Sequence, residues 1–451
     1  MLSTAKIHPI MGEKYDQTDP KDILRYARGL IGKSLSEVVL STFKVRSGKG
    51  KLGQYVEELY FGLKANNESR PDFEAAGVEL KTFPVKKLVK GDYVAKERVK
   101  LGSIKYESLI NEVWESSSLL KKNSLLLFLA YLFEKGVSDL DYVFILANLW
   151  EFDEADLKII KDDWLKIQNK VKEGRAHEIS EGDTLYLGAV TSAQKGTDRV
   201  SQPCSTEKAK PRALCLKQQY MNVVLGKIFK SKTADFERVV KSLREYKKGE
   251  TFESLVESRF KPYFGKSLDE LGENFGVNPK AKNFAATVSR RILGVKTKKI
   301  EEFEKAGITV KTIRLDKSGR PEEAMSFPYF KFKELAQESW EESTLRNQWV
   351  GRFFFVVFAK DSAGVYRLEK VKFWSMPELI LDQEVKLVWE STKKAIIFGD
   401  LSQAPKSSDD AVAHIRPHGS NSKDVDELPN GKLETKRCFW LNVKFIQKIV
   451  K

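Results

Sequence analysis

The sequence predicts an α/β protein of two tandem domains, each of which combines helices and strands. The chain has 451 residues, which exceeds the size of an ordinary single domain. Its two halves repeat short motifs in the same order. Each half also contains both helix-like and strand-like hydrophobic patterns. We therefore expect domains at residues 1–230 and 251–451, joined by a charged linker at residues 231–250.

The internal repeat consists of three motifs, each present once per half. The spacing between the two copies changes only slowly along the chain, and a duplicated domain explains this pattern most simply. The pairs are Gly32-Lys33-Ser34-Leu35 with Gly265-Lys266-Ser267-Leu268, residues 73–82 with residues 303–312, and Trp114-Glu115-Ser116-Ser117 with Trp340-Glu341-Glu342-Ser343.

Hydrophobic periodicity predicts the elements of each half. Residues 55–63 carry apolar side chains at helical spacing, and residues 78–85 alternate apolar and polar side chains as a half-buried strand does. Apolar runs at 125–133 and 352–359 suit central strands or a core helix. Pro, Ser, Asn and Asp cluster at 402–431, which predicts a long surface loop.

The composition indicates a protein that binds polyanions. The formal net charge is +15, and each Lys or Arg that neutralises a phosphate releases condensed counterions. The cysteines number three, with no metal-ligand spacing, and no signal peptide is visible at the start. The longest apolar run is far shorter than the roughly 20 residues of a membrane helix. We expect a cytoplasmic protein with a nucleic-acid partner and no membrane partner.

The strongest local signal is Pro71-Asp72 followed by Glu79-Leu80-Lys81. Residues two apart on a strand share a face, so Glu79 and Lys81 point to the same side. A turn before the strand can bring Asp72 beside Glu79. Two carboxylates and the Leu80 carbonyl form an oxygen-rich site that suits Mg²⁺, while Lys81 can orient a water and stabilise developing negative charge. Phosphodiester hydrolysis needs these functions, and this is the PD-(D/E)xK arrangement of nucleases.

Two other triplets match the same short pattern. They are Glu245-Tyr246-Lys247 and Glu384-Val385-Lys386, the second with Asp382 nearby. In so charged a chain, a solvated edge is the simpler explanation of an isolated triplet. The first site differs because it has the Pro-Asp lead, the strand alternation and a preceding helix, at residues 53–58, that could add a third carboxylate.

Residues 53–62 and 71–85 closely resemble the MutH family, which includes the mismatch-repair GATC nickase and the two-domain GATC restriction endonucleases of the Sau type. Similarity to the restriction enzymes extends through most of the chain, including residues 176–182 and 325–327. The resemblance implies two restriction-endonuclease-like domains, each with a mixed central sheet flanked by helices. It also implies Mg²⁺ as cofactor, Asp72 and Glu79 as metal ligands, and Lys81 as the catalytic lysine.

The resemblance also implies an acidic residue on the preceding helix and a further lysine. Counting back from Gly62 gives Glu58 and counting forward from Gly53 gives Glu57, because this chain has one extra residue between the glycines; we favour Glu58. The further lysine corresponds to Lys122, with Lys121 as the neighbouring alternative.

The family reads DNA through a Tyr-Leu-x-Ile-Arg-Pro-Lys segment. In the first copy, residues 186–192 lack its basic residues, so we take Lys195, which is nearest, and Lys217 as candidate DNA contacts. The second copy has His414-Ile415-Arg416-Pro417-His418, which is closer to the family pattern. We expect Arg416 and His418 to contact DNA, since an arginine can read guanine bidentately. The alternative for Arg416 is a structural role in its loop.

The second copy is predicted to be catalytically silent. Aligning the repeats matches Glu79 with Thr309, Glu58 with Arg290 and Asp72 with Glu302, whereas Lys311 is retained. Such a site has too little negative charge for Mg²⁺ but attracts phosphate, so Arg290 and Lys311 are candidate DNA contacts. We expect a domain that binds a second DNA site as an allosteric effector, as in the restriction enzymes that the chain resembles. A decayed domain kept only for packing is the alternative.

The expected function is therefore that of a type II (type IIE) restriction endonuclease that cuts double-stranded DNA at GATC. Its expected partners are DNA, a second copy of the chain assembled on DNA, and a cognate DNA methyltransferase in a bacterial cell. Rival hypotheses are a mismatch-repair nickase, a non-catalytic DNA-binding protein and an RNA-processing nuclease. The second domain argues against the first, the intact Asp72, Glu79 and Lys81 argue against the second, and the family resemblance argues against the third.

Overall fold

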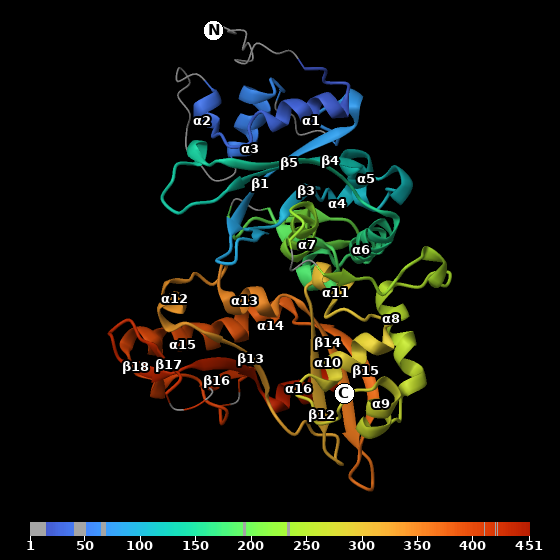
Figure 1. Cartoon of the computed structure of the whole chain (residues 1–451), viewed down its shortest axis with the longest axis vertical. Coiled ribbons are helices and arrows are strands. Elements are labelled where there is room, and N and C mark those ends of the chain that lie inside the picture. The colour runs from blue at the N-terminus through green and yellow to red at the C-terminus, as the bar shows by residue number, and fades with distance from the viewer. Residues whose placement is uncertain are drawn as a thin grey trace. The chain divides into compact units, whose positions relative to one another are not determined.

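The computed structural model describes residues 15–39, 51–64, 69–192, 195–231, 235–409, 411–419, 421 and 423–451. The chain forms two compact α/β units, one comprising Met1–Ile179 with Asp183–Asp235 and the other Ser180–Gly182 with Phe236–Lys451. Figure 1 shows the elements of both units. The predicted linker is corrected here: from Phe236 onward its residues belong to the second unit, because Val239 and Val240 are buried there.

The first unit is built on a four-stranded sheet in the order β2-β1-β4-β5. β1 and β4 are parallel, and β2 and β5 run antiparallel to their neighbours. Three short helices lie on one face of this sheet, where Val78 and Leu80 pack into the core. The elements are β1 (Val78–Lys87), β2 (Tyr93–Ala95), β4 (Leu125–Leu132), β5 (Phe144–Glu151), α1 (Pro20–Arg28), α2 (Leu35–Val38), α3 (Lys51–Tyr55) and the π-helix η1 (Val56–Tyr60). The strand expected at 78–85 is thus confirmed, and the apolar run at 125–133, for which a central strand or a core helix is expected, forms the strand β4.

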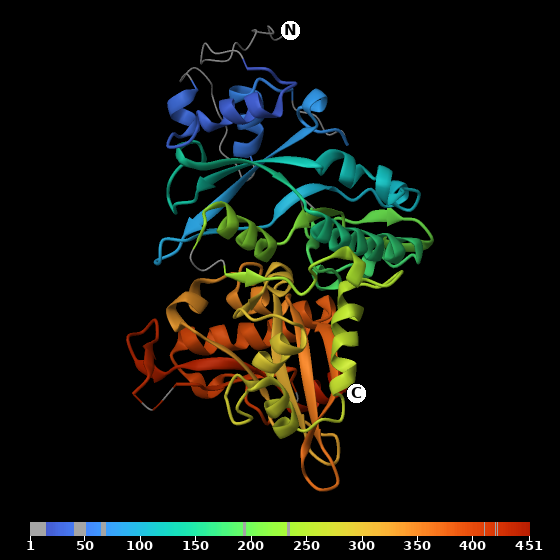
Figure 2. The ribbon, with the colours of Figure 1, turned by 45° about the vertical axis from the view of Figure 1, so that its right-hand side comes forward.

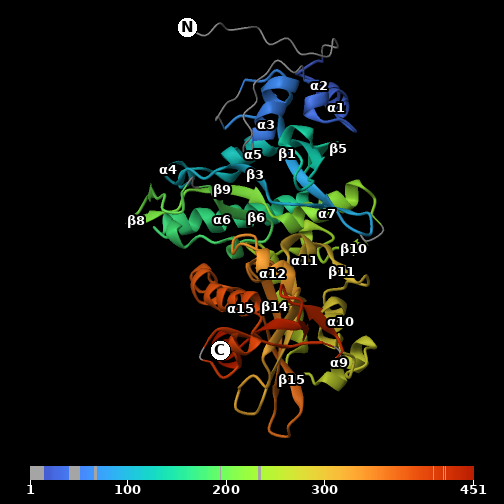
Figure 3. The ribbon, with the colours of Figure 1, turned by 90° about the vertical axis from the view of Figure 1, so that its left-hand side faces the viewer.

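A smaller antiparallel sheet in the order β3-β9-β6 completes the first unit, and helix α6 runs along it (Figure 3). The buried Asp163 of α6 pins the start of β6 by accepting hydrogen bonds from the backbone N–H groups of Leu185, Tyr186 and Leu187. The elements are β3 (Val99–Ser103), β6 (Leu187–Thr191), β7 (Val200–Gln202), β8 (Ser205–Ala209), β9 (Arg212–Leu216), α4 (Tyr106–Leu109), α5 (Ser118–Asn123), α6 (Glu154–Lys172) and α7 (Gln218–Ile228).

The second unit repeats this strand pairing. β12 is parallel to β14, which is antiparallel to β15, and β19 lies between β13 and β16. Its strands are β10 (Phe236–Glu237), β11 (Lys299–Ile300), β12 (Ile308–Leu315), β13 (Met325–Phe330), β14 (Arg352–Lys360), β15 (Tyr366–Ser375), β16 (Ala413–Pro417), β17 (Val425–Glu427), β18 (Leu433–Thr435) and β19 (Arg437–Leu441). Its helices are α8 (Phe252–Phe260), α9 (Leu268–Phe275), α10 (Phe284–Ile292), α11 (Glu301–Ala306), α12 (Phe332–Gln337), α13 (Thr344–Trp349), α14 (Glu378–Ile380), α15 (Lys386–Phe398) and α16 (Val443–Val450).

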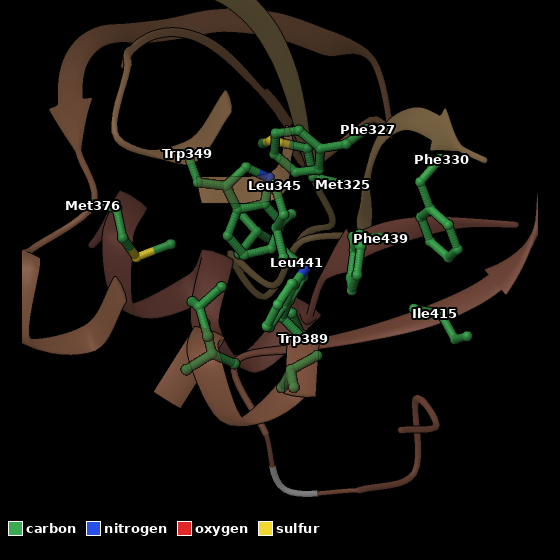
Figure 4. Packing of buried hydrophobic residues seen from close by; sticks show 14 of the residues in the cluster. Met325, Phe327, Phe330, Leu345, Trp349, Met376, Trp389, Ile415, Phe439 and Leu441 are labelled. Atoms are coloured by element: carbon green, nitrogen blue, oxygen red, sulfur yellow. The ribbon is translucent and has the colours of Figure 1, made fainter. Parts of the chain in front are cut away.

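The packing of the two units is repeated as well. The rings of Trp114 and Trp164 lie 5.7 Å apart in the first unit, and those of Trp340 and Trp389 lie 5.6 Å apart in the second. The core of the second unit gathers Phe327, Trp389, Phe439 and other large side chains between its sheets and helices (Figure 4). The duplicated motifs thus lie at equivalent places in two similarly built cores.

Residues 352–359 and 402–431 both contain regular structure in the second unit. The apolar run at 352–359, for which a central strand or a core helix is expected, forms the central strand β14. The long surface loop expected at 402–431 is wrong in part, because it contains β16 and β17. Residues 413–415 of β16 are buried against β19, so burial of a short strand overrides its polar, Pro-containing surroundings. Within the described part of the chain, no helix is both long enough and apolar enough to cross a membrane.

Candidate active site

A tight turn before β1 brings the two predicted carboxylates together. Phe73 pairs with Val78 in an antiparallel bridge, and the short 3₁₀ helix between them ends at Gly77, whose φ is 66°. A left-handed conformation of this kind favours glycine, since it is strained for residues with a Cβ. The turn folds the chain back on itself, so Asp72 lies beside Glu79 although seven positions separate them in the sequence.

Reciprocal hydrogen bonds hold this arrangement. The backbone N–H of Asp72 donates to Glu79 Oε2 at 3.1 Å, and the backbone N–H of Leu80 donates to Asp72 Oδ2 at 3.0 Å. The N–H and C=O of one strand residue point to the same side. The Leu80 carbonyl therefore lies on the edge of β1 that faces Asp72. Three oxygen donors, from Asp72, Glu79 and Leu80, thus gather along one edge of the strand.

Two lysines reach the same carboxylate. Lys81 Nζ lies 2.6 Å from Glu79 Oε1, and Lys122 Nζ lies 3.5 Å from the same atom. Lys122 is on α5, which begins where the buried Ser117 hydroxyl accepts a hydrogen bond from the Leu120 N–H. Lys121, the alternative, is exposed. The structure therefore brings Asp72, Glu79, Lys81 and Lys122 together.

Of the two acidic candidates on the preceding helix, Glu57 rather than the favoured Glu58 lies near the other site residues. Glu57 interacts electrostatically with Asp72, Glu79 and both lysines. Glu58 instead accepts a solvent-exposed hydrogen bond from the Gln54 side chain at 2.8 Å. Both lie in the π-helix η1, where one extra residue widens a helical turn. The extra residue between Gly53 and Gly62 was the sequence signal for this turn, and it rotates Glu57 toward the site.

Burial dominates the electrostatics of the two glutamates. It raises the pKa of Glu79 to about 7, with Lys81 opposing and Asp72 reinforcing the shift. It also raises the pKa of Glu57 to about 7, with Asp72 and Glu79 adding to the shift. The short contact with Lys81 therefore does not compensate for the loss of water around Glu79. Near neutral pH each glutamate is partly protonated, and a cation at the site would favour the charged forms.

The donor set fits Mg²⁺. Among the described residues, no group of three or more His, Cys, Asp or Glu side chains converges as a metal cage. Two carboxylates and one carbonyl leave the remaining positions to water, which is how Mg²⁺ is commonly bound. Burial, reinforced by neighbouring carboxylates, raises the pKa values of Glu57 and Glu79, so a bound cation would favour their charged forms.

The two competing triplets form no comparable site. Glu245 caps a 3₁₀ helix and pairs with Arg259. Asp382 accepts hydrogen bonds from the Trp340 indole and from Arg346. Both triplets thus have structural explanations.

Among the residues described in the second unit, no acidic cluster occupies the equivalent centre. Thr309 pairs with Phe353 as Glu79 pairs with Leu126. The Glu302 carboxylate accepts hydrogen bonds from the backbone of Val239 and Val240, at 3.0 and 3.1 Å. Glu302 therefore anchors the start of its own unit.

The two basic residues of this centre, Lys311 and Arg290, have different hydrogen-bond partners. Lys311 Nζ donates to the Ser326 carbonyl at 2.6 Å and lies over the Phe327 ring, and burial lowers its pKa. Arg290 bonds to the Thr287 hydroxyl at 3.1 Å, and burial and Arg291 lower its pKa. Lys311 is thus engaged within the unit, whereas the partly buried Arg290 bonds to a residue of its own helix.

The remaining predicted DNA contacts differ in accessibility. Lys195 is exposed in the loop after β6. The structure contradicts the prediction for Lys217, which is 3% exposed and donates to the Thr184 carbonyl. A DNA phosphate cannot reach an ammonium group that is enclosed in this way. The residues that flank Lys217 in the sequence do not indicate that its side chain is buried at the start of α7.

Arg416 and His418 share one aromatic neighbour that sequence reasoning missed. The Arg416 guanidinium lies 4.2 Å from the centre of the Trp440 ring, and the exposed His418 ring meets the same indole edge-on at 5.6 Å. In the first unit, strand register places Val190 at the position of Arg416 and Cys215 at the position of Trp440. A cation stacked on an aromatic ring in β19 is therefore specific to the second unit.

Comparison with known proteins agrees with these observations. A family model described as MutH, the DNA mismatch repair enzyme, matches residues 61–163 and again residues 293–379. The type II restriction enzyme Sau3AI of Staphylococcus aureus is 35% identical over 476 residues, covering 94% of this chain and 96% of that protein. The mismatch repair protein MutH of Shewanella baltica (strain OS185) is 24% identical over 216 residues, covering 46% of this chain and 95% of that protein.

The longer match spans both units, and the two family matches fall one in each unit. The chain therefore belongs to the MutH family and, within it, to the Sau-type type II restriction endonucleases, which are site-specific deoxyribonucleases.

Proposed function

We propose that the first unit cuts double-stranded DNA at GATC with Mg²⁺, and that Asp72, Glu79 and the Leu80 carbonyl hold the metal. The observation that carries the proposal is the meeting of Asp72, Glu79, Lys81 and Lys122 on one edge of β1. Sequencing the ends of the fragments released from a plasmid tests the site assignment. Ends that map to GATC support it, and ends that map elsewhere overturn it.

Each side chain has a distinct task in this proposal. Bound Mg²⁺ would supply Lewis acidity that activates a water and neutralises charge on the attacked phosphate. Lys81 orients that water and stabilises the negative charge that develops on the phosphate oxygens. Lys122 adds a second positive charge from the side of α5. Glu57 completes the acidic environment and can accept a proton, because its pKa of about 7 lies near the working pH.

At limiting Mg²⁺, we expect the cleavage rate to rise as the pH increases from about 6 to about 8. Glu57 and Glu79 have pKa values of about 7, so below this pH protons occupy the carboxylates and compete with the metal. Above it the carboxylates are charged and Mg²⁺ binds more tightly. Rates measured at several Mg²⁺ concentrations check this, since saturating metal should move the midpoint to lower pH. A midpoint that does not depend on Mg²⁺ would contradict competition at these residues.

We further propose that the second unit is a degenerate PD-(D/E)xK domain that binds another GATC site as an allosteric effector. Thr309 in place of Glu79 and the engagement of Glu302 with Val239 and Val240 remove the acidic cluster. The stacking of Arg416 on Trp440 fixes a guanidinium plane, which favours bidentate reading of guanine. Because one chain then has one cutting centre, cleavage of both strands requires two chains to associate on DNA. A cognate methyltransferase would protect the host's own sites.

Arg416→Ala is expected to abolish stimulation by a second DNA site. Allosteric coupling of this kind is commonly fivefold or more, so the rate advantage of a plasmid with several GATC sites over one with a single site, about fivefold in the unchanged enzyme, should fall to near one. The single-site rate should not change. Arg320→Ala, which removes an exposed arginine of the same unit, is the matched control. A variant that keeps the multi-site advantage would exclude Arg416 from effector binding.

A nickase is the second candidate function, and one acidic centre per chain favours it. A mismatch-repair relative would release nicked circles as its final product. Accumulation of linear DNA supports the restriction enzyme, and nicked circles that persist at excess enzyme support the nickase.

A further inference from the structure

The turn between β1 and β2 forms a tip that projects from the sheet of the first unit (Figure 2). We refer to residues 86–91 as the hairpin tip. Val89 is fully exposed and Leu88 is 46% exposed. The turn closes through hydrogen bonds from Leu88 N–H to the Asp92 carbonyl and from Gly91 N–H to the Leu88 carbonyl, and Gly91 has a φ of 92°. Two aliphatic side chains are thus held in water at the end of a defined turn.

Lysines surround these two aliphatic side chains. Lys86, Lys87 and Lys90 are all exposed, and none forms an ion pair with any residue that the structure describes. Lys87 lies over the Tyr93 ring at 5.9 Å. Lys86 and Lys87 are consecutive strand residues, so they point to opposite faces of the hairpin. Uncompensated positive charge therefore flanks the aliphatic pair on both faces.

Helix α7 braces the hairpin. The Ala95 N–H donates to the Asn222 side chain at 2.8 Å, and the Gln218 side chain donates to the Ala95 carbonyl at 2.7 Å. The Tyr93 and Phe229 rings pack 4.9 Å apart. A tip fixed in this way loses little conformational entropy when it binds a partner.

The simplest explanation of such lysines is protection of a strand edge from aggregation. That explanation accounts for Lys86 and Lys87 but not for Leu88 and Val89, because exposed aliphatic side chains at a tip invite association. Lysines together with an apolar wedge are instead the combination found in proteins that grip a DNA groove, with cations on phosphates and aliphatic side chains against the sugars and bases.

The position of the tip defines which DNA it can reach. β1 continues from the active-site residue Lys81 to Lys87, and Leu88 follows directly. Seven residues of strand span about 23 Å, which corresponds to about seven base-pair steps of a duplex lying along the strand. A four-base-pair recognition site is shorter than this distance, so the tip would meet flanking DNA.

We propose that the hairpin tip binds the duplex that flanks the cleavage site, with Lys86, Lys87 and Lys90 on phosphates and Leu88 and Val89 against the minor-groove wall. This inference rests on the DNA-cutting activity of the first unit. It does not depend on an effector role of the second unit or on the identity of the recognised bases.

Binding of two duplexes by the full-length enzyme, measured by fluorescence anisotropy in EDTA, tests the proposal. One duplex extends about three base pairs beyond the site, which is too short to reach the tip. The other extends about twelve base pairs, which is long enough to pass it. The test variant combines Lys86→Ala, Lys87→Ala and Lys90→Ala. Lys21→Ala, which removes an exposed lysine of α1, is the control.

We expect the test variant to bind the long duplex at least about tenfold more weakly at about 0.1 M salt. The slope of the logarithm of the binding constant against the logarithm of the salt concentration should decrease by the amount that about two to three phosphate contacts contribute. Binding of the short duplex and its cleavage in Mg²⁺ should match the unchanged enzyme. Leu88→Ser with Val89→Ser should weaken long-duplex binding about fivefold without changing the salt dependence, since it removes no charge.

Equal losses on both duplexes, or no loss on either, would overturn the proposal. A loss with the lysine variant alone would overturn the apolar contact and leave the phosphate contacts. Cleavage of the short duplex by the unchanged enzyme reports the proposed function separately, so failure of that function cannot be mistaken for failure of the tip.

Discussion

Lys81→Ala should lower the rate of DNA cleavage about a thousandfold while leaving DNA binding nearly intact. Lys81 is the cation nearest to the Glu79 carboxylate, at 2.6 Å, and stabilises charge that appears mainly in the transition state. Its loss also removes an interaction that lowers the pKa of Glu79, so this carboxylate would be more protonated near neutral pH and would hold Mg²⁺ less well. Single-turnover cleavage of a GATC duplex measures the effect.

Lys121→Ala is the matched control for the lysines of the site. Lys121 is exposed and adjacent in sequence to Lys122, so its removal changes the net charge equally without touching the Glu79 carboxylate. Its cleavage rate should stay within about twofold of the unchanged enzyme. Circular dichroism of both variants controls for folding. A Lys81→Ala enzyme that cuts at the normal rate would contradict the placement of the chemistry on β1.

Glu57→Gln should lower the cleavage rate about a hundredfold, whereas Glu58→Gln should change it by less than about threefold. Glu57 faces Asp72 and Glu79, where burial raises its pKa to about 7. Glu58 instead accepts a solvent-exposed hydrogen bond from Gln54. The two substitutions make the same chemical change at adjacent residues, so each serves as the control for the other. Rates at saturating DNA and Mg²⁺ separate loss of catalysis from loss of binding.

The opposite order of effects, with Glu58→Gln the more damaging, would mean that the π-turn does not orient Glu57 as described. Equal and small effects would exclude both residues from the reaction. Deletion of Glu58 adds an independent readout. Removing one residue should convert the π-turn to an α-turn and rotate Glu57 away from Asp72, so this variant should resemble Glu57→Gln.

The sequence predicts the geometry of β1 well because local rules determine it. Strand alternation sets Glu79 and Lys81 on one face, and the conformation of Gly77 reverses the chain so that Asp72 meets Glu79. The duplicated cores follow from apolar patterning in the same way, and the repeated tryptophan pairs occupy equivalent places. These features depend on residues close in sequence or on a strong hydrophobic pattern.

Features set by tertiary packing were less predictable. Glu57 and Glu58 are adjacent, and only the widened turn decides which one enters the site. The burial of Lys217 against Thr184 depends on contacts across the unit, and β16 forms because β19 pairs with it. The stretch after Phe236 has a charged composition typical of a linker, yet Val239 and Val240 anchor it through Glu302. Hydrophobic periodicity in the sequence predicts none of these structural features, because contacts between distant residues determine them.

The most direct test of the central claim is the conversion of supercoiled plasmids that carry one or several unmethylated GATC sites, in Mg²⁺ and in EDTA. We predict that linear products form in Mg²⁺ but not in EDTA, and that they form faster on the multi-site plasmid. Binding without any Mg²⁺-dependent break would contradict this claim.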